Sequence, residues 1–131
     1  MGNMTRIVLN GNSYPIKMDL NVLEHIQNKY GTIDAFELEL LGLKFQKDKE
    51  GKQIYKPDGE PLMYLTEPSI RALKTALPLM INEGLAIEAD EQNRSWKEVS
   101  DKEIFRECNI DFHWLAKIIH QEFKRCFEIK K

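Results

Sequence analysis

The sequence predicts an α+β fold, with an N-terminal β-hairpin followed by a mainly helical domain and a possible β-hairpin arm or loop at 44–65. Two observations support this prediction. Apolar residues alternate on both sides of an Asn-Gly turn near the N-terminus, and they recur every three or four residues through most of the remaining chain. A length of 131 residues suits one domain, so residues 1–131 are expected to form a single domain that carries the 44–65 insertion.

The N-terminal hairpin is predicted from two short runs, Thr5–Asn10 and Ser13–Met18. Asn10 and Gly11 tolerate the positive φ angles that a two-residue hairpin turn requires. Pro15 has no N–H to donate, which favours an edge strand. We expect the hairpin to pack on the helix that follows it, through Ile7, Leu9, Tyr14 and Ile16.

Two helices are predicted next, each with a polar residue at its start and a glycine at its end. Asp19 is suited to cap the first helix, whose apolar side chains share one face until Gly31 stops it. Thr32 opens the second helix, and Gly42 ends it. Residues 44–65 then contain two Gly-bearing turn signals between short mixed runs, which is typical of either a hairpin arm or a mobile loop.

A third helix carries the widest apolar stripe and is therefore expected at the centre of the core. Thr66 is the predicted N-cap, Pro78 should kink the helix, and Asn82–Gly84 resembles its end, although the helix could continue to Ala89. The stripe consists of Ile70, Leu73, Leu77, Met80, Ile81 and Leu85.

Two more helices complete the prediction. Ser100 and Glu103 have the spacing of a capping box, which opens a short helix. Either Asn109 or Asp111 begins the last helix. The apolar positions of that helix are Phe112, Leu115, Ile119, Phe123 and Phe127, with Trp114 and Ile118 widening the face.

Charge and cysteine content limit the possible partners and compartments. The net charge of −2 and the pI near 5.9 give no electrostatic reason to expect nucleic-acid binding. The two cysteines are too few for a secreted disulfide framework and are expected to be reduced. No apolar run has the length of a signal peptide or of a membrane span, so we expect a cytoplasmic protein without a membrane partner.

No residue pattern indicates catalysis. His113 and His120 flank the apolar stripe of the last helix at a spacing looser than that of zinc ligands, and both are expected to face solvent. Cys126 lies six residues from His120 on the same helix, so the two side chains point in different directions, and Cys126 is expected to fill the core. A glycine-rich phosphate loop is also missing from the sequence. We therefore predict a protein that is not an enzyme, with no catalytic residues, no metal site and no cofactor.

Four stretches have a characteristic order and apolar-polar pattern, and together they cover about half of the chain: Ile7–Gly11, Tyr14–Leu23, Tyr30-Gly31 and Ile70–Leu85. In these stretches the layout resembles that of the tail assembly chaperones of long-tailed bacteriophages and prophages of Gram-positive bacteria. The resemblance consists of element order and short apolar-polar strings rather than a catalytic signature. The insertion at 44–65 departs from the shorter family pattern.

The resemblance implies a non-enzymatic role in the bacterial host cytosol. Such chaperones bind the tape measure protein, help recruit tail tube subunits and are not expected in the mature virion; self-association is a further possibility. Two alternatives remain open on the sequence alone. One is a structural head–tail connector or tail completion protein, and the other is a small regulatory DNA-binding protein, against which the acidic pI argues.

A chaperone of this kind needs an apolar surface that adapts to several helical segments, and methionine and aromatic side chains suit that purpose. The candidates for this partner-binding surface are Met63, Tyr64, Trp96, Trp114 and Phe127. Trp114 and Phe127 could instead be core residues, since both share helical spacing with the apolar stripe of the last helix.

Overall fold

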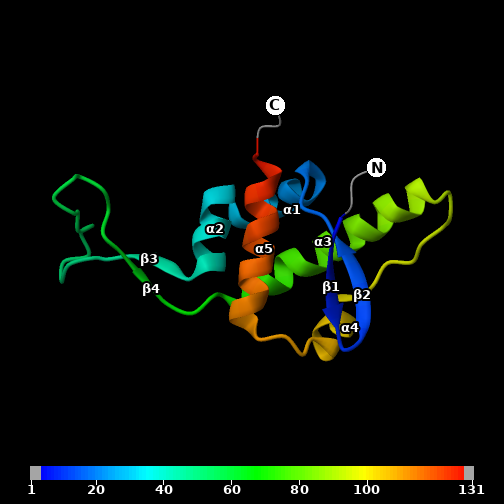
Figure 1. Ribbon diagram of the computed structural model, residues 1–131. Coiled ribbons are helices and arrows are strands. Elements are labelled where there is room, and N and C mark those ends of the chain that lie inside the picture. The colour runs from blue at the N-terminus through cyan, green and yellow to red at the C-terminus, as the bar shows by residue number, and fades with distance from the viewer. Residues whose placement is uncertain (1–3, 129–131) are drawn as a thin grey trace.

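A computed structural model describes residues 4–128 of the chain (Figure 1). The predicted α+β fold is confirmed: a two-stranded antiparallel hairpin precedes a mostly helical body. In chain order the elements are β1 (Thr5–Leu9), β2 (Asn12–Ile16), α1 (Leu20–Tyr30), α2 (Ile33–Leu41), β3 (Leu43–Phe45), β4 (Met63–Leu65), α3 (Ile70–Glu91), α4 (Asp101–Glu107) and α5 (Phe112–Cys126).

The N-terminal hairpin has the turn that its sequence predicts. Leu9 pairs with Asn12, which leaves Asn10 and Gly11 as the two loop residues, with φ angles of 49° and 84°. These positive angles match the twist of the flanking strands. Pro15 lies opposite Arg6 in a sheet of two strands, so both strands are edges and the missing N–H of Pro15 is tolerated.

The hairpin packs on α3, so the expectation that it would pack on the following helix, α1, is wrong. Gly84 of α3 explains why the hairpin packs on this helix, because a Cβ at position 84 would lie 2.5 Å from the Pro15 carbonyl oxygen. With only a hydrogen at that position, β2 approaches the helix backbone closely. The Lys17 N–H then donates a 3.1 Å hydrogen bond to the Met80 carbonyl.

The N-cap residues predicted for α1 and α2 are confirmed, whereas the one predicted for α3 is wrong. The side chains of Asp19 and Thr32 accept hydrogen bonds from backbone N–H groups in the first turns of α1 and α2, as predicted. However, α3 is capped by Ser69 rather than by Thr66. The Thr66 hydroxyl instead donates to the Gly42 carbonyl at 2.7 Å, which leaves Ser69 as the residue that bonds the first turn.

Helix α3 extends beyond Asn82–Gly84, the stretch that resembles a helix end in the sequence. It passes through Pro78 and Gly84 and ends at Glu91, so the alternative of a continued helix is the correct one. At 1.5 Å per residue, its 22 residues span about 33 Å. The contact between β2 and Gly84 stabilises helix at a position where glycine alone would weaken it.

The starts of α4 and α5 are capped by side chains, and the structure decides between the two residues that could begin the last helix. Ser100 accepts from the Glu103 N–H at 3.2 Å and opens α4. Asp111, rather than Asn109, caps α5, since its carboxylate accepts from the His113 N–H at 2.8 Å. Asn109 has another role, because its side-chain oxygen accepts from the Asn10 N–H in the hairpin turn at 3.1 Å.

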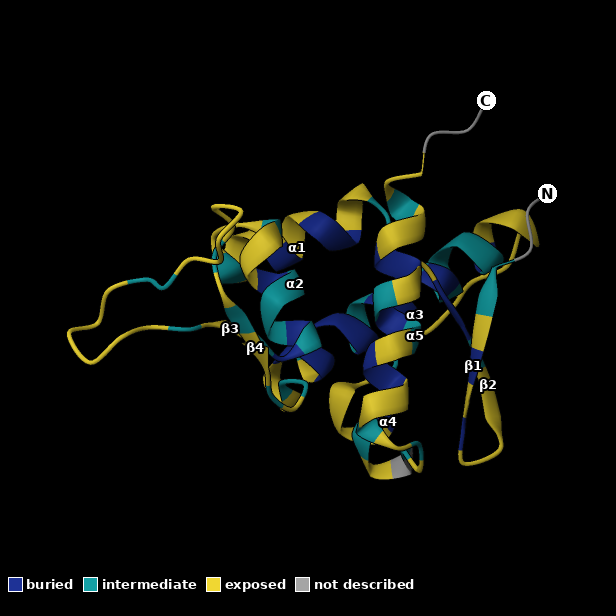
Figure 2. Cartoon of the chain, turned by 60° about the vertical axis from the view of Figure 1, so that its left-hand side comes forward, coloured by how far each residue is buried: buried dark blue, intermediate teal, exposed yellow. Residues whose placement is uncertain are grey.

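The core lies where α3 is covered by the hairpin, α1, α2 and α5 (Figure 2). Leu73, Leu77 and Met80 are buried at its centre, as predicted from the apolar stripe. Phe36 of α2 and Ile119 of α5 are also fully buried, which ties both helices to the same core. The chain between α2 and α3 contributes no side chain to this core.

Candidate partner-binding surface

The segment between α2 and α3 forms an arm, defined here as residues Leu43–Leu65, that projects away from the helical body (Figures 1 and 2). Its stem is the antiparallel pair β3–β4, in which Leu43 lies opposite Leu65 and Phe45 opposite Met63. Of the two forms that the sequence allowed for this segment, the structure has the β-hairpin arm.

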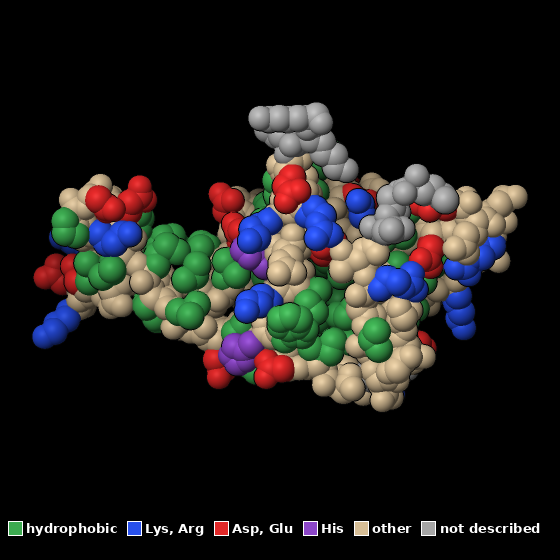
Figure 3. Space-filling model, in the orientation of Figure 1, with side chains coloured by type: hydrophobic (Ala, Val, Ile, Leu, Met, Phe, Trp, Pro, Cys, Tyr) green, Lys and Arg blue, Asp and Glu red, His purple; other side chains and the backbone are tan. Residues whose placement is uncertain are grey.

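The stem has one strongly apolar face. Side chains alternate along a strand, so the pairs Leu43–Leu65 and Phe45–Met63 point to one side, whereas the pair Lys44–Tyr64 points to the other. We call the four residues of the first two pairs the apolar face of the arm. Leu65 is 74% exposed and Phe45 is 41% exposed. Figure 3 shows hydrophobic side chains gathered along the arm.

Beyond the stem, the arm ends in two tight turns that repeat at an interval of eight residues. One is closed by a bridge between Lys47 and Gln53, and the other by a bridge between Tyr55 and Pro61. Equivalent backbone hydrogen bonds support both: the Asp48 N–H donates to the Lys52 carbonyl at 2.9 Å, and the Lys56 N–H donates to the Glu60 carbonyl at 2.8 Å.

The two turns and the stem meet in a closed cycle of backbone hydrogen bonds. The Gln46 N–H donates to Leu62, the Leu62 N–H to Ile54 and the Ile54 N–H back to Gln46, at 2.8, 2.8 and 3.1 Å. The Gln53 side-chain amide lies against the same three carbonyl oxygens, at 3.4, 3.0 and 3.1 Å respectively. The tip therefore holds its shape through main-chain bonding, without a hydrophobic core of its own.

The two residues that flank the arm, Gly42 and Thr66, are bonded to each other at its root. The Thr66 N–H and hydroxyl both donate to the Gly42 carbonyl, at 2.6 and 2.7 Å. Gly42 is in the left-handed region, with φ of 74°, and a Cβ there would lie 2.6 Å from the Thr66 carbonyl oxygen. A glycine is thus required where the two strands leave the body.

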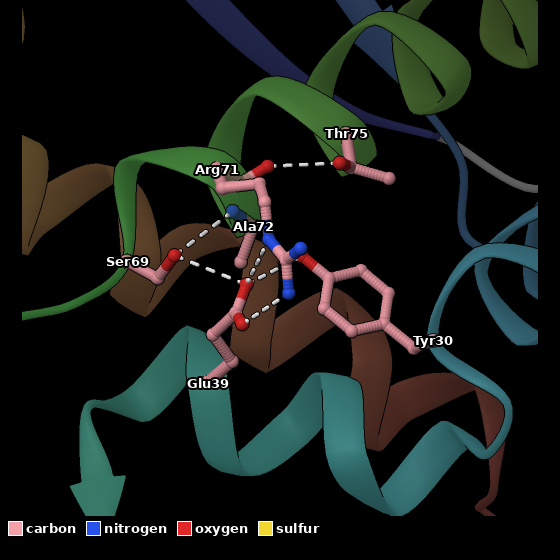
Figure 4. Close-up of polar contacts among 6 residues, drawn as sticks. All are labelled: Tyr30, Glu39, Ser69, Arg71, Ala72 and Thr75. Carbon is pink, nitrogen blue, oxygen red and sulfur yellow. Dashed lines mark hydrogen bonds and ion pairs between the residues drawn. The ribbon is translucent and has the colours of Figure 1, made fainter.

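A polar network next to this root joins α1, α2 and α3 (Figure 4). The Glu39 carboxylate accepts hydrogen bonds from the Tyr30 hydroxyl at 2.6 Å and from the Ser69 hydroxyl at 3.1 Å. Arg71 donates two further bonds, at 3.2 and 2.6 Å, and its guanidinium lies 5.0 Å from the Tyr30 ring centre. This bidentate pair holds the start of α3, and with it the direction of the arm, against α2.

The network shifts the pKa values of three of its members, Glu39, Tyr30 and Arg71, and the bond to Glu39 raises the pKa of the Arg71 guanidinium. Burial alone would raise the pKa of Glu39, but the hydrogen bonds from Arg71, Tyr30 and Ser69 outweigh it and lower the pKa. Burial and the nearby Glu39 carboxylate raise the pKa of the Tyr30 hydroxyl. The network is therefore held with an ionised Glu39 and a neutral Tyr30 over the whole neutral range.

The five candidate residues do not form one surface. Met63 belongs to the apolar face of the arm, whereas Tyr64 points to the opposite side of the same strand. Trp96 lies in the connector before α4 and lines a cleft beside α3.

Trp114 and Phe127 are each 54% exposed, so neither is the core residue that the spacing also allowed. Phe127 lines a groove between α2 and α5, and the Lys117 ammonium lies 5.9 Å from the Trp114 ring centre.

One expectation about the histidines is wrong. His120 does not face solvent: its side chain is 18% exposed, and its Nε2 lies 2.8 Å from a Glu37 carboxylate oxygen across the α2–α5 contact. His113 is exposed, as expected, beside Asp111. Among the side chains that the structure describes, no group of three potential metal ligands comes together. Cys108 and Cys126 are half-buried and are not joined to each other.

Sequence reasoning missed three residues of the apolar face, namely Leu43, Phe45 and Leu65. The signal was present in the strings Leu-Lys-Phe and Met-Tyr-Leu, which lie on either side of the two turn signals. Their pairing register turns these separated apolar residues into one face, and that register depends on the chain folding at the tip.

No protein-family model, curated protein or solved structure matches this chain. None of the helices in the described part of the chain has the length and apolar character needed to cross a membrane.

Proposed function

We propose that this chain is a phage tail assembly chaperone, which binds the tape measure protein, helps recruit tail tube subunits and leaves before the particle is complete. The observation that carries the proposal is the apolar face of the arm. The same chain buries its core side chains well, yet it presents these four apolar residues on a projecting ribbon. Clustered exposed apolar side chains of this kind mark sites of interaction with other proteins.

The geometry of the apolar face suits a helical partner. Strands of three residues span about 10 Å, which matches roughly two turns of an α-helix. The apolar side chains of an amphipathic helix form a stripe along one side of the helix. Two turns of such a stripe are long enough to cover all four residues at once. In this proposal the arm shields apolar stripes of the tape measure protein that would otherwise aggregate.

The small size of the face favours reversible binding. Fully burying one aliphatic or aromatic side chain contributes about 1.5–3 kcal/mol, and association itself has a large entropic cost. Leu43 and Met63 are already half-buried in the free chain, so Phe45 and Leu65 contribute most of the newly buried area. A single arm would then bind weakly, and several copies along one long partner would hold it by avidity.

Co-expression with the tape measure protein from the same genome tests the proposal. This chain should move that partner into the soluble fraction and co-purify with it, and the complex should survive salt that screens surface charges. A tape measure protein that is equally soluble alone, or a complex lost at moderate salt, would contradict the proposal.

Matched variants locate the contact. Phe45→Ser combined with Leu65→Ser should abolish co-purification, whereas Tyr64→Ser on the opposite face should leave it largely intact. Circular dichroism of each variant checks that the body remains folded. Equal losses from both variants would show that the apolar face is not the contact surface. Mass spectrometry of purified particles adds a second test, because a chaperone should be missing, whereas a structural connector would be present in stoichiometric amount.

A further inference from the structure

A second surface lies between α1, α3 and the connector that precedes α4. It is a cleft of about 540 Å³, a volume in the range of about 300–1,000 Å³ typical of ligand pockets. Its floor includes the apolar side chains of Val22, Leu79 and Val99, and its rim includes the exposed indole of Trp96. Trp96 is thus positioned over a cavity rather than over bare solvent.

The connector wall of this cleft is built into the fold. The Asn82 side chain makes a reciprocal pair of hydrogen bonds with the backbone of Val99: its amide donates to the Val99 carbonyl at 3.0 Å, and its oxygen accepts from the Val99 N–H at 2.8 Å. At the other end of the connector, the Arg94 N–H donates to the Ala89 carbonyl at 2.9 Å. These bonds hold the segment that carries Trp96 and Glu98 against α3.

Most of the ionisable side chains around the cleft are acidic. Glu83, Glu98 and Asp101 line it together with His25, and no lysine or arginine does. Across residues 4–128, none of these three carboxylates makes an ion pair with a lysine or arginine. Glu83 accepts a hydrogen bond from the Asn21 side chain at 2.8 Å, and one oxygen of Asp101 accepts from the Lys102 N–H at 2.9 Å. Glu98 is therefore the carboxylate most open to a partner, and Asp101 retains its second oxygen.

We propose that this cleft receives an arginine side chain of a partner protein. The apolar floor accommodates the methylene stem of such a residue, and the carboxylates of Glu98 and Asp101 accept from its guanidinium. The Trp96 indole offers a face on which the planar guanidinium stacks. Lysine shares the charge but lacks the planar fork, and a neutral side chain lacks the charge. Charge complementarity therefore selects a cationic side chain, and the planar guanidinium selects arginine over lysine.

Fluorescence of Trp96 provides the test, and it does not depend on the function of the arm. In a Trp114→Phe background, Trp96 is the only indole in the chain. We would titrate this protein with the peptide acetyl-Gly-Arg-Gly-amide and with the same peptide carrying lysine or citrulline in place of arginine. The arginine peptide should give a saturable change in emission, with an affinity at least about tenfold higher than that of the isosteric but neutral citrulline peptide.

Carboxylate variants complete the experiment. Glu98→Gln, with or without Asp101→Asn, should lower the arginine affinity at least about threefold, whereas Glu91→Gln, an exposed carboxylate outside the cleft, should not. Equal binding of arginine and citrulline peptides, equal binding of lysine and arginine peptides, or affinities unchanged by Glu98→Gln would overturn the assignment. Circular dichroism verifies that each variant is folded, so a loss of binding can be attributed to the cleft.

Discussion

Gly84 offers the sharpest test of how the hairpin and the helical body are joined. In most helices, replacing an interior glycine by alanine stabilises the protein, because alanine has the higher helix propensity by about 0.8–1.0 kcal/mol. Gly84 lies inside α3, so propensity alone predicts that Gly84→Ala is stabilising. The structure predicts the opposite sign.

The magnitude follows from the contact with β2. A Cβ at Gly84 would lie 2.5 Å from the Pro15 carbonyl oxygen and 3.1 Å from the Ile16 nitrogen. Ordinary contacts begin near 3.4 Å, so β2 would have to recede by almost 1 Å. Overpacking of this kind costs about 1–3 kcal/mol, and weakening the Lys17–Met80 hydrogen bond adds about 0.5–1.5 kcal/mol. After the propensity gain, Gly84→Ala should destabilise the protein by about 1–3 kcal/mol.

Thermal and urea unfolding followed by circular dichroism measure this effect. For a chain of this length, the expected loss lowers Tm by about 3–10 °C. Ala86→Gly in the same helix is the matched control, and it should destabilise by about 1 kcal/mol through propensity alone. A Gly84→Ala protein that is more stable than the parent would refute the close approach of β2 to α3.

The remaining predictions concern the helix cap, the core and the network at the arm's root. Asp19→Ala should reduce the free energy of unfolding by about 0.5–2 kcal/mol, and an unchanged melting curve would contradict capping by Asp19. Leu77→Ala should cost about 2–5 kcal/mol; a loss below about 0.5 kcal/mol would place α3 at the surface. Because the pKa of Glu39 is lowered on folding, its stabilisation is present above the unfolded pKa near 4.5 and disappears as pH falls through the lower folded value. Glu39→Gln should therefore flatten the loss of stability between pH 5 and 3, and parallel pH profiles of variant and parent would refute this role.

Local signals in the sequence predicted much of the fold because short-range chemistry determines those features. The Asn10-Gly11 turn, the Asp19 cap and the buried stripe around Leu77 depend on neighbouring residues or on helical periodicity, and all three are present. The partner of the hairpin was mispredicted because it depends on Gly84, whose missing side chain looks like a helix stop in sequence but permits close packing in three dimensions.

The candidate surface was predictable only in part, for a similar reason. Met63 was identified from its chemistry, but Phe45 and Leu65 become its neighbours only through the register of β3 and β4. Trp96 was singled out as an exposed aromatic, whereas the cleft beneath it is created by the pairing of Asn82 with Val99, 17 residues apart in the chain. Long-range pairing of this kind leaves no periodic signal in the sequence.

Site-specific photo-crosslinking shows whether the apolar face of the arm contacts a helical partner. A photoreactive phenylalanine analogue would replace Phe45 in one variant and Tyr64 in the other, each co-expressed with the tape measure protein. We expect an efficient crosslink to the tape measure protein from position 45 and little or none from position 64. Co-purification without a crosslink from position 45, or crosslinks of equal yield from both positions, would contradict it.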